Sequence, residues 1–253
     1  MLSRYENTKD LSFYDIYLKH KQAKRPQGNN PEKDQAIADY YAKLRKFWEY
    51  GELRLITRAE MPHYMLARHK QHSKKPFRLH AIHSYLADYF SNDTKFNEAQ
   101  IIAKNDRMKP DLSKGIALVG DYGVGKSTAL KCCSQLDKNT GVYLNNGYTH
   151  YLDANEFTLN YSISGMEIYD RWKNKAVLFI DDVGNEPDVK YYGSEIRVVA
   201  QLLRYRYEHN LITHITSNSK LSELTTIYGQ HVTDRMLDQF NFFMWEGESK
   251  RGT

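Results

Sequence analysis

The chain has 253 residues, enough for one large domain or two small ones, and carries a net charge of +5. It contains no apolar run of about 18 residues, and its first residues lack the apolar stretch of a secretory signal, so we expect no membrane span and no export. Its two cysteines, Cys132 and Cys133, are adjacent and cannot easily bridge each other, which favours a reducing cytoplasm as the location.

The charge is unevenly distributed along the chain. Residues 1–110 hold 21 Lys and Arg against 13 Asp and Glu, whereas residues 111–253 hold 15 against 18. A basic region favours a polyanionic partner, most commonly nucleic acid, although a solvated helical surface gives the same composition. We therefore predict a basic, mainly helical N-terminal region at 1–110 that binds a partner, DNA or both, and a separate domain at 111–253.

Helical spacing of apolar residues predicts several helices in the N-terminal region. The first has Asn30 as its N-cap and Pro31 as its first residue, and it ends at Gly51. The sequence Thr57-Arg58-Ala59-Glu60 matches a capping box and indicates the start of a second helix. Further helices are expected near 80–90 and, as a short one, around 97–104.

Three groups of side chains in this region are candidates for binding. The histidines form two H-x-x-H pairs that could hold zinc, although a basic surface is the commoner explanation; they are His69, His72, His80 and His83. A basic segment could follow a phosphate backbone or simply be solvated; it contains Arg68, Lys70, Lys74, Lys75 and Arg78. An aromatic stripe is expected to be core or a partner-helix face rather than a base-stacking platform; it contains Tyr40, Tyr41, Phe47 and Trp48.

From residue 111 onward the pattern alternates between strands and helices. Short apolar strands are expected at 115–120, 149–152, 176–180, 211–216 and 242–245, and helices at 126–136 and 194–208. Such alternation is typical of parallel βαβ units, and the continuous apolar run at 176–180 favours a strand covered on both faces. The sequence therefore predicts an α/β domain with a parallel sheet flanked by helices.

A phosphate-binding loop is predicted at residues 120–127, with the spacing G-x-x-x-x-G-K-S between an expected strand and an expected helix. In such a loop the backbone N–H groups surround phosphate oxygens, Lys126 reaches the β- and γ-phosphates, and the Ser127 hydroxyl binds Mg²⁺. We therefore expect ATP and Mg²⁺ as ligands. The expected nucleotide-binding residues are Gly120, Asp121, Tyr122, Gly123, Val124, Gly125, Lys126, Ser127 and Thr128.

Polar residues follow two later strands. The strand at 177–180 ends in two carboxylates, and we expect it to lie beside the P-loop strand, with Asp181 holding Mg²⁺ through waters and Asp182 polarising an attacking water. Aspartate is shorter than glutamate, so significant turnover and a non-hydrolysing site both remain open. Asn218 follows another strand and could orient the water or contact the γ-phosphate, although Ser-Asn is also common in turns.

The ordered set of motifs resembles a known family. It comprises Gly-Asp-Tyr-Gly-Val-Gly-Lys-Ser-Thr, Leu-Phe-Ile-Asp-Asp-Val-Gly-Asn-Glu, Thr-His-Ile-Thr-Ser-Asn, Tyr-Gly-Gln-His-Val-Thr-Asp-Arg-Met and Gly-Glu-Ser-Lys-Arg. These motifs, over roughly 111–251, resemble the DnaC/DnaI-type AAA+ replicative helicase loaders and the related IstB-type transposition helper ATPases. The resemblance implies a P-loop AAA+ fold, Mg²⁺-dependent ATP hydrolysis, and loading of a replicative helicase onto single-stranded DNA during replication.

The resemblance also implies roles for individual residues. It places Asn218 at the sensor 1 position and Arg235 at the arginine finger that completes the site of a neighbouring subunit in a homo-oligomer. Arg251 corresponds to a basic residue near the nucleotide, and the N-terminal region corresponds to the part that grips the helicase. His231 stands where the family often has a second arginine. A transposition helper and an ATP-dependent DNA-binding scaffold with little turnover are the alternatives.

Overall fold

The computed structural model describes residues 54–59, 61–73, 80–102, 109–134, 142–144, 149–191 and 194–249. The chain divides into two compact units, Met1–Gly51 and Glu52–Thr253, and every described residue lies in the second. The helix expected after Asn30 and its aromatic stripe therefore lie outside the described residues. The same holds for Arg251 and for three residues of the basic segment, which are Lys74, Lys75 and Arg78.

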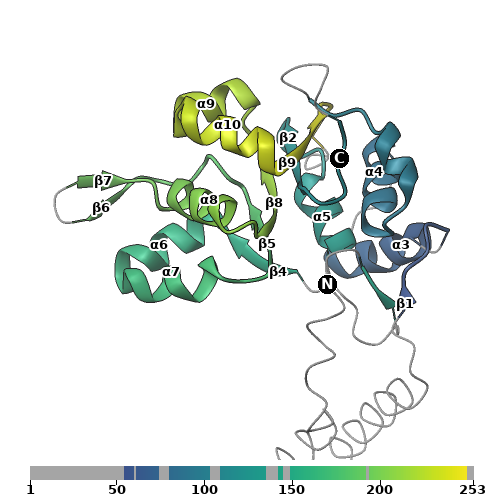
Figure 1. Cartoon of the computed structure of the whole chain (residues 1–253), viewed down its shortest axis with the longest axis horizontal. Coiled ribbons are helices and arrows are strands. Elements are labelled where there is room, and N and C mark those ends of the chain that lie inside the picture. The colour runs from purple at the N-terminus through teal and green to yellow at the C-terminus, as the bar shows by residue number, and fades with distance from the viewer. Residues whose placement is uncertain are drawn as a thin grey trace, which may run out of the picture. The chain divides into compact units, whose positions relative to one another are not determined.

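A five-stranded parallel sheet forms the centre of the second unit, with the strand order β4-β5-β8-β2-β9 (Figure 1). Its strands are β2 (Gly115–Gly120), β4 (His150–Asp153), β5 (Val177–Asp181), β8 (Ile212–Ser217) and β9 (Phe240–Trp245). All four strand pairs are parallel. The predicted α/β fold, a parallel sheet flanked by helices, is confirmed.

One detail of the predicted topology is wrong. We expected the strand ending in Asp181 and Asp182 to lie directly beside the P-loop strand, but β8 lies between β5 and β2 and pairs with both. The chain leaves β5, crosses through α8 (Val198–Glu208) and returns as β8. The end of β8, with Asn218 just beyond it, therefore lies between the P-loop and the two aspartates.

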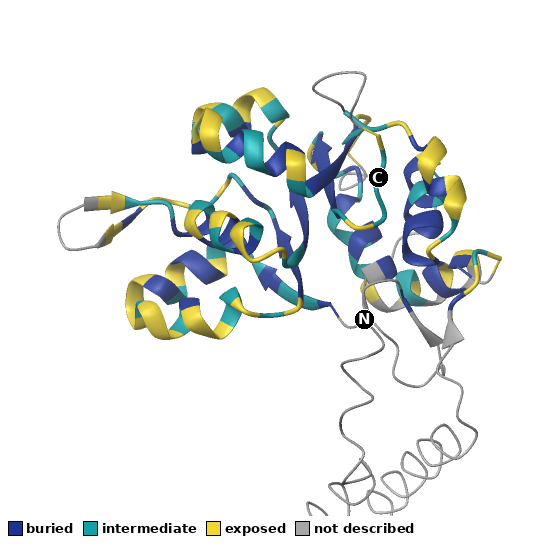
Figure 2. Cartoon of the chain, in the orientation of Figure 1, coloured by how far each residue is buried: buried dark blue, intermediate teal, exposed yellow. Residues whose placement is uncertain are grey.

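Helices cover both faces of the sheet because both faces are apolar. Ile116 and Leu118 of β2 belong to the core cluster that includes buried residues of α3 (Met61–His72), α4 (Ala81–Phe90) and α5 (Lys126–Ser134). Ala117 and Val119 face the opposite cluster, with α6 (Ala154–Ser164), α7 (Met166–Lys173), α8, α9 (Leu221–Tyr228) and α10 (Gln230–Gln239). Figure 2 shows the buried sheet between these two helical layers.

The described part of the N-terminal region packs against the sheet domain. Helix α4 begins after the N-cap His80, near the expected position, and α3 follows the proposed capping box. The short helix expected around 97–104 is instead a 3-10 turn, η2 (Thr94–Glu98), because the Asp93 side chain accepts a hydrogen bond from Lys95 N at 2.9 Å and starts it earlier. The compact unit thus begins at Glu52, while the functional boundary at residue 110 stays a prediction.

A hairpin replaces the start of the helix that we expected at 194–208. Strand β6 (Val189–Tyr191) pairs antiparallel with β7 (Ser194–Ile196), and α8 begins only at Val198. Cross-strand pairs account for this: Val189 lies opposite Ile196, and Lys190 lies opposite Glu195 with the opposite charge. Two further short strands, β1 (Arg54–Leu55) and β3 (Val142–Tyr143), pair in parallel.

The two cysteines are core residues of α5. Burial raises the pKa of Cys132 to about 12 and raises the pKa of Cys133 well above its usual value. Both thiols therefore stay protonated at neutral pH and are poor nucleophiles.

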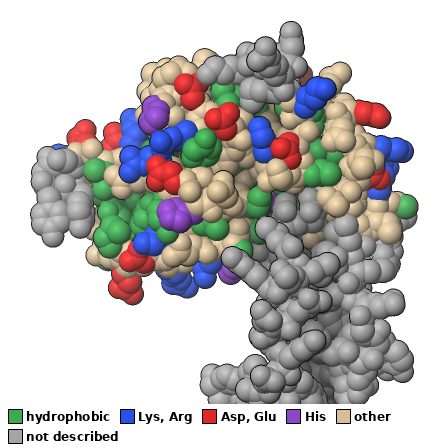
Figure 3. All heavy atoms as spheres, viewed as in Figure 1, with side chains coloured by type: hydrophobic (Ala, Val, Ile, Leu, Met, Phe, Trp, Pro, Cys, Tyr) green, Lys and Arg blue, Asp and Glu red, His purple; other side chains and the backbone are tan. Residues whose placement is uncertain are grey.

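Exposed apolar side chains gather where α6 meets α7. Leu159, Ile163 and Met166 are exposed, and Ile163 keeps 82% of its surface accessible. Figure 3 shows hydrophobic side chains on this part of the surface, near the β6–β7 hairpin. Exposed apolar groups that lie together are typical of interaction surfaces. Among the described residues, no helix is both long and apolar enough to cross a membrane.

Candidate nucleotide-binding site

The loop between β2 and α5 has a backbone that requires glycine. Gly120, Gly123 and Gly125 have φ angles of 122°, 79° and 112°, in a region that side chains disfavour. A Cβ on Gly120 would lie 2.5 Å from the carbonyl oxygen of Trp245, and one on Gly123 would overlap the Ser249 side chain. Glycine lets the loop curl ahead of the helix N-terminus, the arrangement that directs backbone N–H groups toward an anion. The residues present therefore fit a phosphate group.

Lys126 is the buried cation of this loop, with only 4% of its surface exposed. Its Nζ donates to the carbonyl oxygens of Gly120 and Asp121 at 2.9 and 2.6 Å, and to Oδ1 of Asn218 at 2.9 Å. Burial lowers the pKa of Lys126, while the negative charge of Asp182 has the largest opposing effect and acts to raise it. The ammonium is thus held beside the loop by acceptors that a phosphate oxygen can replace.

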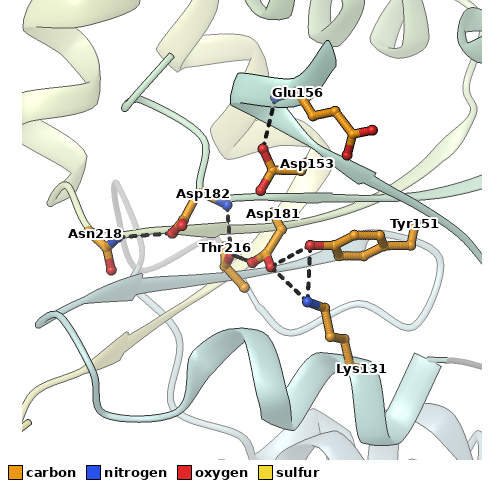
Figure 4. Close-up of polar contacts among 8 residues, drawn as sticks. All are labelled: Lys131, Tyr151, Asp153, Glu156, Asp181, Asp182, Thr216 and Asn218. Atoms are coloured by element: carbon orange, nitrogen blue, oxygen red, sulfur yellow. Dashed lines mark hydrogen bonds and ion pairs between the residues drawn. The ribbon is translucent and has the colours of Figure 1, made fainter. Parts of the chain in front are cut away.

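Asp181 is the buried carboxylate at the end of β5, with 4% of its surface exposed. Oδ1 accepts a hydrogen bond from the Thr216 hydroxyl. Oδ2 accepts one from the Tyr151 hydroxyl at 3.0 Å and forms an ion pair with Lys131 Nζ at 3.3 Å (Figure 4). A carboxylate this buried requires such partners, because desolvation penalises its charged form.

Asp182 combines a left-handed backbone conformation with a partly buried carboxylate. Its φ of 59° lies in the left-handed region, which few residues other than glycine adopt. Its N–H donates to the Thr216 hydroxyl at 3.1 Å, and its Oδ1 accepts from Asn218 Nδ2 at 2.9 Å. Burial raises the pKa of Asp182, and the nearby charges of Asp181 and Asp153 raise it further. A raised pKa makes this carboxylate a stronger base than an ordinary aspartate.

Asn218 connects the two sides of the site. Its Oδ1 accepts from Lys126, its Nδ2 donates to Asp182, and it stands just beyond β8 between the two (Figure 4 shows the Asp182 contact). The partners fix the orientation of the amide, since the ammonium can only donate and an ionised carboxylate can only accept. The position of β8 between β2 and β5 is what allows one side chain to reach both groups.

The oxygen ligands that Mg²⁺ prefers are present at this edge of the sheet. Ser127 precedes Lys131 by one helical turn of α5, so the two share a helix face, and Lys131 contacts Asp181. Ser127 therefore lies on the same face of α5 as the lysine that contacts Asp181. No group of three or more His, Cys, Asp or Glu is arranged to hold a metal within the described ranges. A magnesium ion held by one or two protein oxygens and by phosphates needs no such group, so these residues fit it.

The segment after β9 folds against the P-loop. Asp121 N donates to the carbonyl oxygen of Trp245 at 3.1 Å, and Gly247 N donates to Asp121 Oδ2 at 3.0 Å. Ser249 lies so close to Gly123 that a methyl group on this glycine would overlap the serine side chain. Ser249, which precedes Arg251 by two residues, therefore lies against the P-loop, whereas Arg251 itself is outside the described residues.

Arg235 is not among the residues gathered at this site. It lies on α10, where its Nη1 pairs with Glu208 Oε1 of α8 at 3.0 Å and its guanidinium carbon lies 5.6 Å from the Tyr207 ring centroid. Both side chains of the ion pair are partly exposed, at 25% for Arg235 and 46% for Glu208. The single chain thus holds Arg235 on its own surface.

The four histidines give no support to a zinc site. His80 Nδ1 accepts from Ile82 N at 3.2 Å, and His83 Nδ1 accepts from His80 N at 2.9 Å, so both rings cap α4. Both rings also contact Trp245, one stacked on it and one edge-on. A structural role in the helix cap and the core explains these two residues.

Sequence reasoning missed Lys131 and Tyr151, which both contact Asp181. A signal for Lys131 existed, because it follows Ser127 by four residues on a predicted helix and so shares its face. No local signal marked Tyr151, whose placement depends on β4 pairing with β5 in the register that sets Tyr151 beside Phe179.

Comparison with known proteins gives similar solved structures only; no family model and no curated protein sequence matches the chain. A protein assigned as a primosome component from Streptococcus pyogenes serotype M3 is 27% identical, over 67% of this chain and 80% of that one, with a TM-score of 0.45. The DnaC helicase loader is 20% identical over 55% of this chain and 82% of that one, with a TM-score of 0.41. DnaI is 24% identical over 55% of this chain and 73% of that one, with a TM-score of 0.42.

Proposed function

We propose that this protein is a Mg²⁺-dependent AAA+ ATPase that loads a replicative helicase onto single-stranded DNA. The observation that carries the ATPase assignment is the Asn218 side chain, which bonds the P-loop lysine, Lys126, and the carboxylate of Asp182 at the same time. Such a bridge makes the position of the carboxylate depend on what the lysine binds. Any change at the phosphate end of the site is thereby transmitted to the group placed to act on water.

Each residue has a distinct task in this proposal. The loop backbone and Lys126 bind the β- and γ-phosphates, while Ser127 and Asp181 hold Mg²⁺, which when bound neutralises charge that develops on the phosphates. Asp182 accepts a hydrogen bond from the attacking water and takes up its proton. The amide nitrogen of Asn218 donates to Asp182 and so fixes the direction of the carboxylate, while the amide oxygen accepts from Lys126.

Assembly supplies the final group. Arg235 is proposed to act as the arginine finger on the site of a neighbouring subunit, since a guanidinium grips phosphate oxygens in a fork. To do so it must leave Glu208. An exposed ion pair of this kind contributes only about 0.2–1 kcal/mol, so its loss is a small cost against a charge-assisted contact with phosphate.

The helicase and the DNA are assigned to the basic N-terminal region, residues 1–110. The described part of this region includes Arg68 and Lys70 on α3, which packs against the P-loop helix α5 within the same compact unit. DNA bound by such residues should dissociate as salt rises, because neutralised phosphates release counterions on binding. The exposed apolar side chains at the α6–α7 junction are a second surface available to a macromolecular partner.

The test is ATP hydrolysis by the full chain, with and without single-stranded DNA, compared with Asp182→Asn. The proposal expects DNA-stimulated turnover in the parent and a loss of about 100-fold in the variant, with nucleotide binding retained. Nucleotide binding without turnover in the parent would indicate an ATP-dependent scaffold instead. The partner is identified by purifying a tagged form of the protein and identifying the proteins that co-purify with it. A transposase among them, in place of a helicase, would indicate a transposition helper.

A second experiment tests the assembly. Mixing Lys126→Ala with Arg235→Ala pairs an intact P-loop with an intact finger at some interfaces, so turnover should partly return and should rise with protein concentration. Full DNA-stimulated turnover by Arg235→Ala alone would assign this residue to its surface ion pair and remove the finger from the proposal.

A further inference from the structure

Two side chains that the nucleotide-binding motifs do not include converge on Asp181. Lys131 comes from α5, one helical turn beyond Ser127, and Tyr151 comes from β4, the strand that pairs with β5 (Figure 4). Lys131 Nζ lies 3.3 Å from Asp181 Oδ2, and the Tyr151 hydroxyl lies 3.0 Å from the same oxygen. The two also contact each other, with Nζ 3.0 Å from the hydroxyl.

These contacts, together with one from Thr216, engage both oxygens of the carboxylate. An ionised carboxylate accepts about four hydrogen bonds, two at each oxygen. Thr216 donates to Oδ1 and Tyr151 donates to Oδ2, while the Lys131 ammonium forms an ion pair with Oδ2. A metal-bound water that approaches Oδ2 must therefore share this oxygen with the charge of Lys131.

The Lys131 ammonium is held in place rather than free in solvent. Its side chain is 27% exposed, and Nζ lies 4.2 Å from the centroid of the Tyr151 ring, within the range of a cation–π contact. Tyr151 is itself fixed by its strand and by edge-on contact with Phe179. A positive charge is therefore positioned by the fold at the carboxylate that the proposed function assigns to Mg²⁺.

We propose that Lys131 is a competing cation at Asp181, held there by Tyr151, and that it sets the Mg²⁺ concentration that the site requires. The inference rests on the proposed nucleotide function and concerns how that site is regulated. Two cations that share one buried carboxylate weaken each other's binding, because each screens the charge that attracts the other. The site then binds its metal only when phosphates supply additional negative charge.

The test is the Mg²⁺ dependence of nucleotide binding by the full chain, followed with a fluorescent ATP analogue. Lys131→Met removes the charge and keeps the length of the side chain, and the half-saturating Mg²⁺ concentration should fall about fivefold. Lys131→Arg keeps the charge and should stay within about twofold of the parent. Lys190→Met, on the β6–β7 hairpin, removes an exposed lysine elsewhere and controls for net charge. Direct Mn²⁺ binding, measured by electron paramagnetic resonance, gives a second readout.

The outcomes separate the inference from the function on which it rests. A Mg²⁺ requirement that is unchanged or higher in Lys131→Met overturns the inference and makes Lys131 a support for Asp181. If that variant does not fold, Lys131→Gln carries the same expectation and the same contrary result. A parent protein that binds no nucleotide at any Mg²⁺ concentration overturns the proposed function instead.

Discussion

The two ends of the central sheet both bury polar side chains, but they use them differently. At the amino ends, Arg206 is fully buried and donates to the carbonyl oxygens of Lys173, Lys175 and Ile212 at 3.0, 2.7 and 2.7 Å. At the same end, Asn241 bonds both the N–H and the carbonyl oxygen of Asp111 at 2.8 Å. These side chains satisfy neutral backbone groups where the chain enters strands.

At the carboxyl ends, several charged groups lie close together and share polar partners: Lys126 and Asp182 both bond Asn218, and Asp181 pairs with Lys131. Lys126, Asp181 and Asp182 are brought together there, although burial raises the pKa of Asp182 and lowers that of Lys126. Asp182 also holds a left-handed backbone conformation. A cluster of desolvated charges and a strained backbone both reduce stability, and they are typical of sites that bind or react. The comparison predicts that changes at the amino ends affect folding, while changes at the carboxyl ends affect binding and turnover.

The largest expected effect is at the P-loop. Lys126→Ala should weaken ATP binding by about 100-fold or more, because it removes hydrogen bonds from an ammonium to phosphate worth about 1.5–3 kcal/mol each. Isothermal calorimetry measures the affinity. The free energy of unfolding should change little, since the substitution removes the desolvation cost of a buried ammonium together with its hydrogen bonds. Affinity within threefold of the parent would contradict the P-loop assignment.

Next in size is the loss of Arg206. Arg206→Met should lower the free energy of unfolding by roughly 3 kcal/mol, because several buried carbonyl groups lose their donor. Chemical denaturation measures it. Arg204→Met is the matched control on the same helix: Arg204 is exposed and its Nε lies 3.9 Å from Glu208, so a change within about 0.5 kcal/mol is expected. An equal fall in the free energy of unfolding for the two variants would mean that the buried hydrogen bonds of Arg206 do not stabilise the fold.

A smaller effect, on the rate of ATP hydrolysis, is expected from the loss of Asn218, which connects Lys126 to Asp182. Asn218→Ala should slow ATP hydrolysis by about ten- to 100-fold while nucleotide affinity falls only a few-fold, since the P-loop backbone remains. Steady-state turnover and equilibrium binding separate the two quantities. Asn160→Ala on α6 is a control outside the site. Unchanged turnover in Asn218→Ala would mean that the bridge does not direct Asp182.

The smallest effect is expected at Asn241, the fully buried amide at the amino ends of the strands. Asn241→Leu keeps the branched shape of the side chain and removes its bonds to Asp111, so the free energy of unfolding should fall by about 1–2 kcal/mol with ATP affinity unchanged. A thermal melt and the calorimetric titration together check this. Loss of ATP affinity without loss of stability would contradict the division between the two ends.

The sequence allowed the site to be predicted wherever its signals are local. The spacing of the P-loop glycines and Lys126, and the two aspartates after an apolar strand, follow from short segments whose conformation depends on nearby residues. All five strands of the sheet were expected for the same reason. The position of β8 was not, because strand order depends on which strands pair across the whole domain.

The remaining misses share this physical cause. Tyr151 reaches Asp181 through strand pairing, and Arg235 meets Glu208 through the packing of α10 on α8, so neither partner is indicated by spacing along one element. The β6–β7 hairpin interrupts an expected helix because cross-strand pairs stabilise residues 194–196 more than helical continuation does. These features depend on contacts between segments that are distant in the sequence, which local sequence patterns do not indicate.

Thermal unfolding of the parent, Lys126→Ala and Arg206→Met, with and without Mg²⁺ and ATP, tests the central claim most directly. A ligand at 100 times its Kd stabilises the folded state by about 2.7 kcal/mol, which raises Tm by a few degrees. We predict this rise in the parent, the same rise from a lower starting Tm in Arg206→Met, and no rise from an unchanged starting Tm in Lys126→Ala. An equal rise in Lys126→Ala, or none in the parent, would contradict the nucleotide site.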